Sequence, residues 1–504
     1  MKSRNKTILL ISMLVMLICC VSAVSAVSAT DADNITVPDD TAVIELDDTV
    51  DSVEEVEQDR GTCTSCCNCN CSITEPTLPT TSNSITVTPS DYTTKFTNGV
   101  FNDASVDEVI FNGDFSSASY TTLNFNQSIT VTATGSTFNN IGFGLLHNGI
   151  VLNGATIIMN APNGADCYAI DIESASNTIV INNKITYTCG YDNAANYNYA
   201  IKAMDSENLT IYGNEINATV PLKQPNWYAV STIASDYVAG VAVGSCNNFR
   251  FDKNNLTVIG NKRVGDYPTL DAFIIAQSAN AKIRGNNIYE SDIVTPEGSA
   301  SYIYGIDVYS CTNITICSNT VDMNGNKTGG QVGGNGTGAA YCIQLTGPHT
   351  GVKICNNNLT TKNKGPNLGI YSQNYYGETS ITVCGNHINV TGNAGNNPWA
   401  LVSGMELQDT YATVCGNTID VTNIGGYHQN YYVFGISYCQ STSGNHTYNI
   451  TNNTVRSLDG DWAVYLDGVI NSNVYNNSLR ANEERGNDAV NMTGTNNHAW
   501  GNTA

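Results

Sequence analysis

Positive charge is scarce in this sequence. The chain carries 21 lysine and arginine residues against 44 aspartate and glutamate residues, so its net charge is −23. This balance argues against a nucleic-acid partner, because no basic patch is available to displace counterions from phosphates. Charged residues of either sign make up only 13% of the chain. The sequence is therefore also unlike a helical bundle, which favours alanine, glutamate, lysine and leucine.

Long apolar runs are missing after the N-terminus. The one present, Ile8–Val21, follows a basic stretch at residues 2–6 and precedes three Val-Ser-Ala steps that end at Ala29. This order is typical of a secretory signal, so we predict a signal peptide over residues 1–29 and a secreted or cell-surface protein. An uncleaved anchor is the alternative, since residues 7–29 are long enough to span a bilayer. Membrane contact is expected only through this segment.

Residues 30–83 have little apolar character. An acidic stretch is followed by the cysteine cluster Cys63–Cys71 and then by a run rich in proline, threonine and serine. Like-charge repulsion and the small apolar area predict a disordered linker.

What the sequence has in abundance is tyrosine, with 27 copies, together with uncharged polar residues, a mixture that suits an exposed β surface. From residue 84 to the end it also repeats a two-part unit. One part reads small-apolar-any-apolar, and the other reads apolar-x-x-Asn-x-apolar. Self-similarity at this period is the mark of a stacked-repeat fold. The recurring asparagines are Asn183, Asn214, Asn254, Asn286, Asn319, Asn357, Asn386, Asn417, Asn453 and Asn477.

Within each unit, apolar and polar residues alternate, as they do in a strand with one buried face. The spacing leaves no room for a helix between strands. We therefore predict an all-β fold over residues 84–504: a single-stranded right-handed parallel β-helix of about 13 coils. The repeated asparagine should occupy a tight turn, because it tolerates the left-handed region, and its amides should stack from coil to coil as a ladder.

The spacings predict where insertions enter each coil. Ile170 and Asn183 are 13 residues apart, and this interval recurs along the chain. The interval from an asparagine to the next unit varies, reaching 27 residues between Asn214 and Val241. Insertions should therefore gather along one edge of the rod.

These repeats, Asn183–Asn502 together with Val106–Met159, resemble the right-handed β-helix repeats of pectate-lyase-like proteins. With the signal segment, the acidic spacer and the richness in asparagine and threonine, the chain resembles the adhesin-like surface proteins of methanogenic archaea. The resemblance implies adhesion, with glycans or surface proteins of other cells as partners. Asn-x-Ser/Thr sequons, such as Asn208 and Asn313, are glycosylation candidates in an exported protein.

The insertions carry aromatic residues among asparagine, serine and glycine, a composition typical of adaptable binding surfaces. The alternative is that these aromatics only pack the insertions onto the rod. The predicted binding residues are Trp227, Tyr228, Trp399, Tyr427, Tyr431 and Tyr432.

A polysaccharide lyase or hydrolase is an alternative function, and a structural envelope component is another. Glycoside hydrolysis needs two carboxylates about 5–9.5 Å apart. The acids expected on outward positions are several coils from one another, more than about 14 Å, except for one close set. That set, Asp171, Glu173 and Lys202, gives weak catalytic candidates, for which a solvated ion pair is the simpler interpretation.

Four cysteines occupy the same offset in successive coils: Cys317, Cys355, Cys384 and Cys415. Stacked thiols could bind a soft metal or pair oxidatively, but four in a row cannot form a tetrahedron, so small turn-filling side chains are favoured. The Cys63–Cys71 cluster lacks the paired arms of a zinc site, which favours a local disulfide or a thiol-rich spacer. The six histidines show no ligand spacing. We predict no metal or cofactor, and no motif supports calcium.

Overall fold

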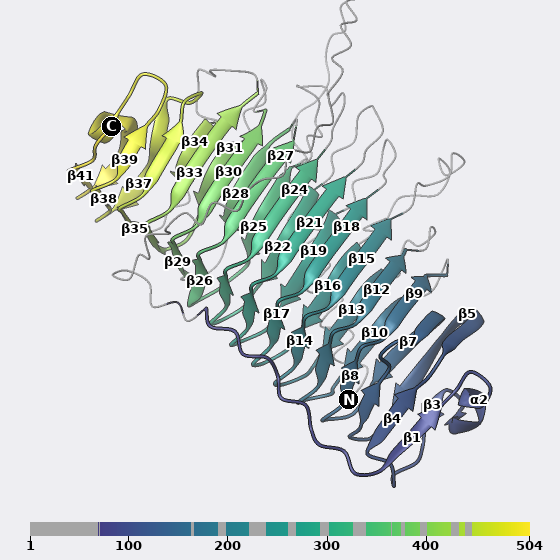
Figure 1. The fold of residues 1–504 in the computed structure, drawn as a ribbon. Helices are drawn as coiled ribbons and strands as arrows, with labels where there is room; N and C mark the ends of the chain where they lie inside the picture. Colours follow the sequence, from purple (N-terminus) through teal and green to yellow (C-terminus); the bar gives the residue numbers. More distant parts are fainter. Residues whose placement is uncertain are drawn as a thin grey trace, which may run out of the picture. The chain divides into compact units, whose positions relative to one another are not determined.

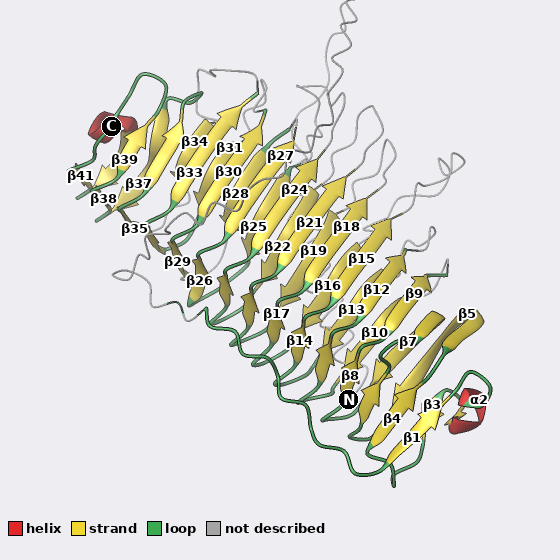
Figure 2. Cartoon of the chain, in the orientation of Figure 1, coloured by secondary structure: helices red, strands yellow, loops and turns green. Residues whose placement is uncertain are grey.

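The computed structural model describes residues 69, 71–162, 166–189, 198–220, 238–260, 269–292, 302–325, 339–363, 365–373, 379–393, 401–424, 433–438 and 446–504. The chain divides into two units at Arg60, and all of these residues belong to the second unit, which begins at Gly61. They are almost entirely strand and turn (Figure 2). Their strands stack in parallel, coil upon coil (Figure 1), and the predicted right-handed parallel β-helix is confirmed.

The first face of the β-helix, which we call sheet A, is a 15-stranded parallel sheet, slightly longer than expected. Its strands are β1 (Ser84–Val87), β4 (Glu108–Phe111), β6 (Thr130–Thr132), β8 (Val151–Asn153), β11 (Ile179–Ile181), β14 (Thr210–Tyr212), β17 (Arg250–Asp252), β20 (Lys282–Arg284), β23 (Thr315–Cys317), β26 (Val352–Cys355), β29 (Ser380–Cys384), β32 (Tyr411–Cys415), β35 (Thr447–Thr451), β38 (Asn473–Tyr475) and β41 (His498–Trp500).

The second face, sheet B, contains the small-apolar-any-apolar repeats. Its strands are β10 (Cys167–Glu173), β13 (Asn198–Met204), β16 (Val238–Gly244), β19 (Thr269–Ala276), β22 (Tyr302–Tyr309), β25 (Ala340–Thr346), β28 (Asn367–Gln373), β31 (Val402–Leu407), β34 (Val433–Tyr438), β37 (Trp462–Ile470) and β40 (Val490–Thr495).

The third face, sheet C, follows the repeated asparagine in each coil. Its strands are β9 (Thr156–Asn160), β12 (Lys184–Thr188), β15 (Glu215–Val220), β18 (Asn255–Gly260), β21 (Asn287–Asp292), β24 (Thr320–Gly325), β27 (Asn358–Asn363), β30 (His387–Gly392), β33 (Thr418–Asn423), β36 (Thr454–Ser457) and β39 (Ser478–Arg480). Near the N-terminal end, β5 (Asp114–Phe125) and β7 (Thr137–Leu145) run across both faces, which joins sheets B and C. The short elements are α2 (Tyr92–Lys95), β2 (Phe96–Thr97), β3 (Val100–Phe101) and η1 (Gly486–Ala489).

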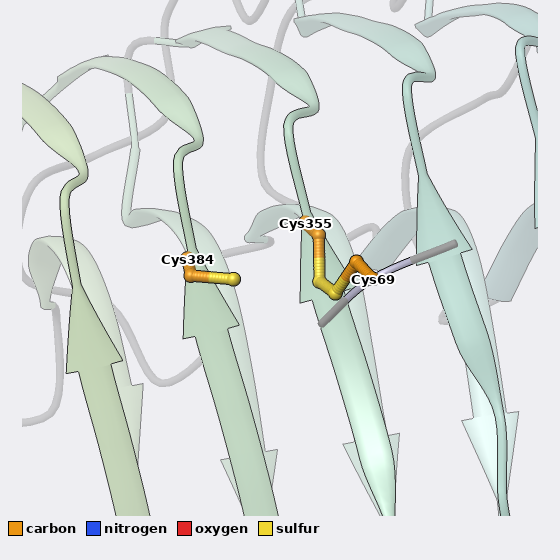
Figure 3. Close-up of side chains that lie close together, drawn as sticks. All are labelled: Cys69, Cys355 and Cys384. Atoms are coloured by element: carbon orange, nitrogen blue, oxygen red, sulfur yellow. A yellow bond between two sulfur atoms is a disulfide. The ribbon is translucent and has the colours of Figure 1, made fainter. Parts of the chain in front are cut away.

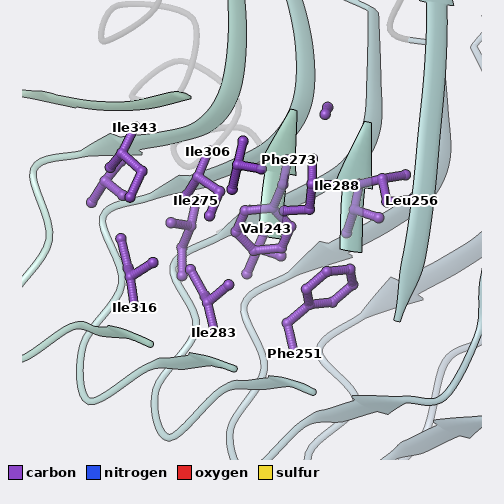
Figure 4. Close-up of a cluster of buried hydrophobic side chains, with 14 of the residues drawn as sticks. Val243, Phe251, Leu256, Phe273, Ile275, Ile283, Ile288, Ile306, Ile316 and Ile343 are labelled. Atoms are coloured by element: carbon purple, nitrogen blue, oxygen red, sulfur yellow. The ribbon is translucent and has the colours of Figure 1, made fainter. Parts of the chain in front are cut away.

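Each coil passes from sheet C to sheet B, then to sheet A, and back to sheet C. Side chains from all three sheets meet in the interior, as Phe251, Leu256 and Phe273 show (Figure 4). The small residue of each sheet-B strand is needed because the chain bends there against sheet C. At Gly305, an added Cβ would lie 2.5 Å from Val321 Cγ1 and 2.8 Å from a backbone carbonyl oxygen of the next coil.

The predicted asparagine ladder forms at the corner between sheets A and C. The Oδ1 of Asn214 accepts hydrogen bonds from both the backbone N–H and the Nδ2 of Asn183, each at 2.9 Å. Asn183 Nδ2 also donates to the carbonyl of Leu152, 3.2 Å away in the coil before. The same bonds recur up the stack, and the ladder residues are buried. Each amide thus satisfies backbone groups that the turn leaves without a sheet partner.

One detail of the turn differs from the expectation. The left-handed residue is not the ladder asparagine but the residue before it, such as Asn182, Gly213 or Lys253. This arrangement follows from the geometry of the turn. The left-handed residue bends the chain from sheet A toward sheet C, so the side chain after it points into the corner, where it can bridge coils.

The N-terminal part of the described chain lies along sheet A rather than free in solvent. We call residues 71–83 the strap (Figure 1). Arg284 Nη1 donates to the carbonyl of Ser72 at 2.5 Å, and Arg250 Nη2 donates to the carbonyl of Thr74 at 2.7 Å. The strap is thus held by side chains of two neighbouring coils.

The strap corrects part of the predicted linker over residues 30–83. Its docking could not be anticipated, because the contacts join positions far apart in sequence. Residues 30–68 and the predicted signal peptide at residues 1–29 lie outside the described residues. Among the residues that are described, no helix is long and apolar enough to cross a membrane.

Candidate functional site on the outward face of sheet B

Two columns of side chains point outward from sheet B, one on each side of the small residue. In-register parallel pairing stacks each column along the rod. The first column contains Tyr168, Tyr199, Asp271, Tyr304, Tyr341, Leu368, Ser403, Phe434 and Trp462. The second contains Asp171, Lys202, Ala242, Ile274, Asp307, Gln344, Tyr371, Glu406, Ser437, Tyr465 and Asn491.

At the N-terminal end of this face, the structure brings the three weak catalytic candidates together. Lys202 Nζ lies 3.0 Å from Asp171 Oδ1, 3.5 Å from Glu173 Oε2, and 4.8 Å from the ring centroid of Tyr168. Burial raises the pKa of Asp171, and the positive charge of Lys202 offsets part of that rise. Because the ammonium group contacts both carboxylates, the set forms an ion pair above an aromatic ring. General base chemistry here would first require Lys202 to move away.

The middle of the face carries two buried acceptor oxygens without donors among the described residues. Asp307 is 5% exposed and is the register partner of Gln344 on the next coil. Asp307 Oδ1 and Gln344 Oε1 are buried, and neither receives a hydrogen bond from the part of the chain that the structure describes. Burial raises the pKa of Asp307 to about 7, although the backbone N–H of Val308 works against that rise. Buried acceptors without donors cost about 1–3 kcal/mol each, so hydroxyl donors that reached these oxygens would recover this free energy.

An aromatic stack runs beside these acceptors. The ring centroids of Tyr304 and Tyr341 are 5.2 Å apart, and those of Tyr341 and Tyr371 are 5.3 Å apart. All three side chains are half-buried. Because Gln344 lies on the same strand as Tyr341, the stack and the acceptors share neighbouring coils. Apolar faces next to hydrogen-bonding groups are what amphipathic ligands require.

The acid farther along the face is already engaged. Ser437 Oγ donates to Glu406 Oε2 at 2.5 Å, and Glu406 is buried. Gln344 and Tyr371 separate Glu406 from Asp307 by three coil steps. Acids in the second column are therefore too far apart to act as a hydrolytic pair, at about 4.8 Å for each coil.

Sequence reasoning missed a buried polar cluster at the corner between sheets B and A. His349 Nε2 lies 2.5 Å from Asp409 Oδ1 and 3.3 Å from Ser372 Oγ, while Nδ1 lies 2.9 Å from the carbonyl of Gly347. Burial by itself would lower the pKa of His349, but the hydrogen bond and charge of Asp409 outweigh it, and the pKa is raised. Serine and aspartate contact the same ring nitrogen, so this is not a nucleophile triad. The pair is 60 residues apart in sequence, and no local motif could have signalled it.

The binding residues predicted from the insertions cannot be placed beside this face. Variable segments do enter each coil between a sheet-C strand and the next sheet-B strand, as between β15 and β16. The aromatic side chains in question nevertheless lie outside the described residues and stay predictions. They are Trp227, Tyr228, Trp399, Tyr427, Tyr431 and Tyr432.

Comparison with known proteins gives no family assignment. No family model and no curated protein match this chain. Among solved structures, the surface adhesin PfbA of Streptococcus pneumoniae is 14% identical, with a TM-score of 0.43, covering 75% of this chain and 86% of that one. The Dettilon tailspike protein is 14% identical, with a TM-score of 0.40, covering 77% and 66%. The periplasmic alginate epimerase AlgG is 9% identical, with a TM-score of 0.35, covering 82% and 84%. Similarities this distant carry no argument about what the chain binds, and they do not bear on the expected archaeal origin.

Proposed function

We propose that this chain is a secreted or cell-surface adhesin-like protein that recognises glycans along the outward face of sheet B. The observation that carries the proposal is the juxtaposition of Asp307 and Gln344 with the Tyr304–Tyr341–Tyr371 stack. A sugar offers hydroxyl donors to the first pair and C–H faces to the rings. The predicted aromatic residues of the insertions would add contacts at the corner where sheet C passes into sheet B.

The expected ligand class is a neutral glycan. The chain has a net charge of −23, and Asp307 sits in the middle of the face. An acidic polysaccharide would meet like charge over this surface, which lowers both its encounter rate and its affinity.

A glycan array probed with the full chain tests the proposal. Tyr341→Ala should weaken binding of a neutral glycan at least tenfold, because it removes the central ring of the stack. Tyr475→Ala is the matched control, since Tyr475 stacks on Trp500 at 4.7 Å on sheet A, away from this face. Equal binding by both variants would contradict the proposed site. Loss of binding on Trp227→Ala or Trp399→Ala alone would move the contact surface to the insertions.

A carbohydrate-active enzyme is the second candidate, because Lys202 lies within reach of two carboxylates. A product assay on the same glycans separates the two functions. Turnover that is abolished by Asp171→Asn would favour the enzyme. Binding without turnover supports the adhesin, and neither binding nor turnover would leave the structural envelope component.

A further inference from the structure

The two cysteine groups that the sequence presents separately form one cluster on the outer side of sheet A. Cys317, Cys355, Cys384 and Cys415 end successive strands and pair in register. All four are buried, and the strap-side residues Cys69 and Cys71 pack against them. The cysteine column is therefore the surface on which the N-terminal cysteines lie.

One disulfide already links the two groups. Cys69 and Cys355 form a disulfide across 286 residues of sequence, and Cys384 lies on the neighbouring coil (Figure 3). Cys384 and Cys415 each take part in a disulfide as well. Among the described residues of the cluster, Cys71 and Cys317 carry the free thiols.

Cys71 and Cys317 face each other one coil away from the Cys69–Cys355 disulfide. Cys71 packs against the column that contains Cys317, with the two thiols in reach of each other, and Asn356 Nδ2 donates to Cys71 Sγ at 3.9 Å. Two residues along the strap thus correspond to one coil along the rod, from Cys355 back to Cys317. Cys71 is partly exposed, whereas Cys317 is buried beneath it.

The surroundings divide the two thiols into an attacking and a resolving group. The hydrogen bond from Cys317 and those from Ser318 and Asn356, with the positive charge of Arg284, outweigh burial and lower the pKa of Cys71 to about 6. The same contact with Cys71, together with burial, raises the pKa of Cys317. The thiolate is therefore the more exposed sulfur, the one an external molecule reaches first.

We propose that Cys71 and Cys317 are a redox site. An external disulfide oxidises them to a second disulfide between the two cysteine groups, and this bond locks the strap onto sheet A. The Cys71 thiolate attacks one sulfur of the external disulfide, a mixed disulfide forms, and the first external thiolate leaves. Cys317 then loses its proton to solvent, its sulfur attacks Cys71 Sγ, and the second external thiolate leaves. Two protein thiols are oxidised and one external disulfide is reduced to two thiols.

Tryptic mapping of the full chain, made in a host that does not glycosylate it, can detect the Cys71–Cys317 disulfide directly. Cleavage after Arg60, Lys95, Arg284 and Lys327 places Cys71 in peptide 61–95 and Cys317 in peptide 285–327, while Cys355 falls in peptide 354–362. After incubation with oxidised glutathione, peptide 61–95 should become linked to 285–327 in addition to 354–362.

Two variants assign the new link. Cys71→Ser should abolish the link to peptide 285–327 and keep the link to 354–362, which also shows that the strap still docks. Cys311→Ser is the matched control, because Cys311 is buried in the same tryptic peptide but belongs to the interior core, and the new link should survive it. Failure of the link to form, or its loss in Cys311→Ser, would overturn the proposal. Retention of a stoichiometric soft metal ion in native mass spectrometry, with no new link, would overturn it in favour of a thiolate metal site.

Discussion

Sheet A and sheet B share one backbone frame but present opposite outer surfaces. Sheet A is covered where the strap lies on it, and beneath the strap Asp252 is fully buried between Arg250 and Arg284, with contacts of 2.9 and 2.6 Å. Sheet B instead carries a tyrosine stack and the acceptor oxygens of Asp307 and Gln344. The difference lies wholly in outward positions, which the fold leaves unconstrained. One face holds the strap, and the other is the face that we propose binds glycans.

The largest expected effect on stability is on sheet A, where the strap lies. Asp252→Ala would leave two guanidinium groups, one of them on the 6% exposed Arg284 side chain, without their buried partner. Breaking a buried pair in this way costs about 3–5 kcal/mol. Urea unfolding should show this loss, and hydrogen exchange should rise in the strap and β17 to β20.

Asp420→Ala is the control for that variant. Asp420 forms a half-exposed ion pair with Arg456 at 3.7 Å, so its loss should cost about 1 kcal/mol or less. If the two variants unfold alike, the pairing on sheet A does not hold the strap and the contrast between the faces is weaker than we state.

The asparagine ladder, which belongs to the backbone common to all faces, gives the next largest effect on stability. Asn319 Oδ1 accepts from both the backbone N–H and the Nδ2 of Asn286, at 3.0 and 2.9 Å. Asn319→Ala would leave these buried donors unpaired and should cost about 1–3 kcal/mol in the free energy of unfolding. Asn287→Ala, on an exposed side chain that donates to Asn255, should change it by a few tenths. Hydrogen exchange in the Asn319 variant should increase on sheets A and C of these coils together.

Replacing an acid on sheet B should change stability in the opposite direction from replacing Asp252 on sheet A. The pKa of Asp307 is raised to about 7 in the folded chain, so the folded state binds this proton more tightly than the unfolded state does. Ionising the buried group therefore destabilises the fold as the pH rises from about 4 through 7. Asp307→Asn should gain about 1–3 kcal/mol at pH 8 and show little difference at pH 4. Urea unfolding at both pH values measures this.

The same variant should lose glycan affinity, because a carboxylate acceptor is replaced by an amide. A gain in stability with a loss of binding is the expected exchange at a functional site. Asp307→Asn that is destabilised at pH 8 would instead make Asp307 a structural residue and remove the contrast with Asp252.

The sequence predicts the features that repeat from coil to coil, but not the contacts between positions far apart in the chain. Strand alternation, the asparagine ladder and the corner of insertion follow from periodic local signals, and the sequence alone predicted each of them. The strap, the Cys69–Cys355 disulfide and the His349–Asp409 pair join distant positions, and no periodic signal marks them. Asp307 occupies an outward position of its strand, but its burial depends on what surrounds the strand, which strand alternation does not encode.

The smallest expected effect tests whether the ion pair on sheet B belongs to the binding face at all. Lys202→Met keeps the length of the side chain but removes its contacts with Asp171 and Glu173 and its charge over Tyr168. These side chains are partly exposed, so solvent screens the interaction, and the free energy of unfolding should change by less than about 1 kcal/mol. Glycan affinity should change little, since the Tyr341 stack lies several coils away. A large loss of affinity would extend the binding surface to the N-terminal end of sheet B. Turnover that disappears with Lys202 would instead mark these three residues as catalytic.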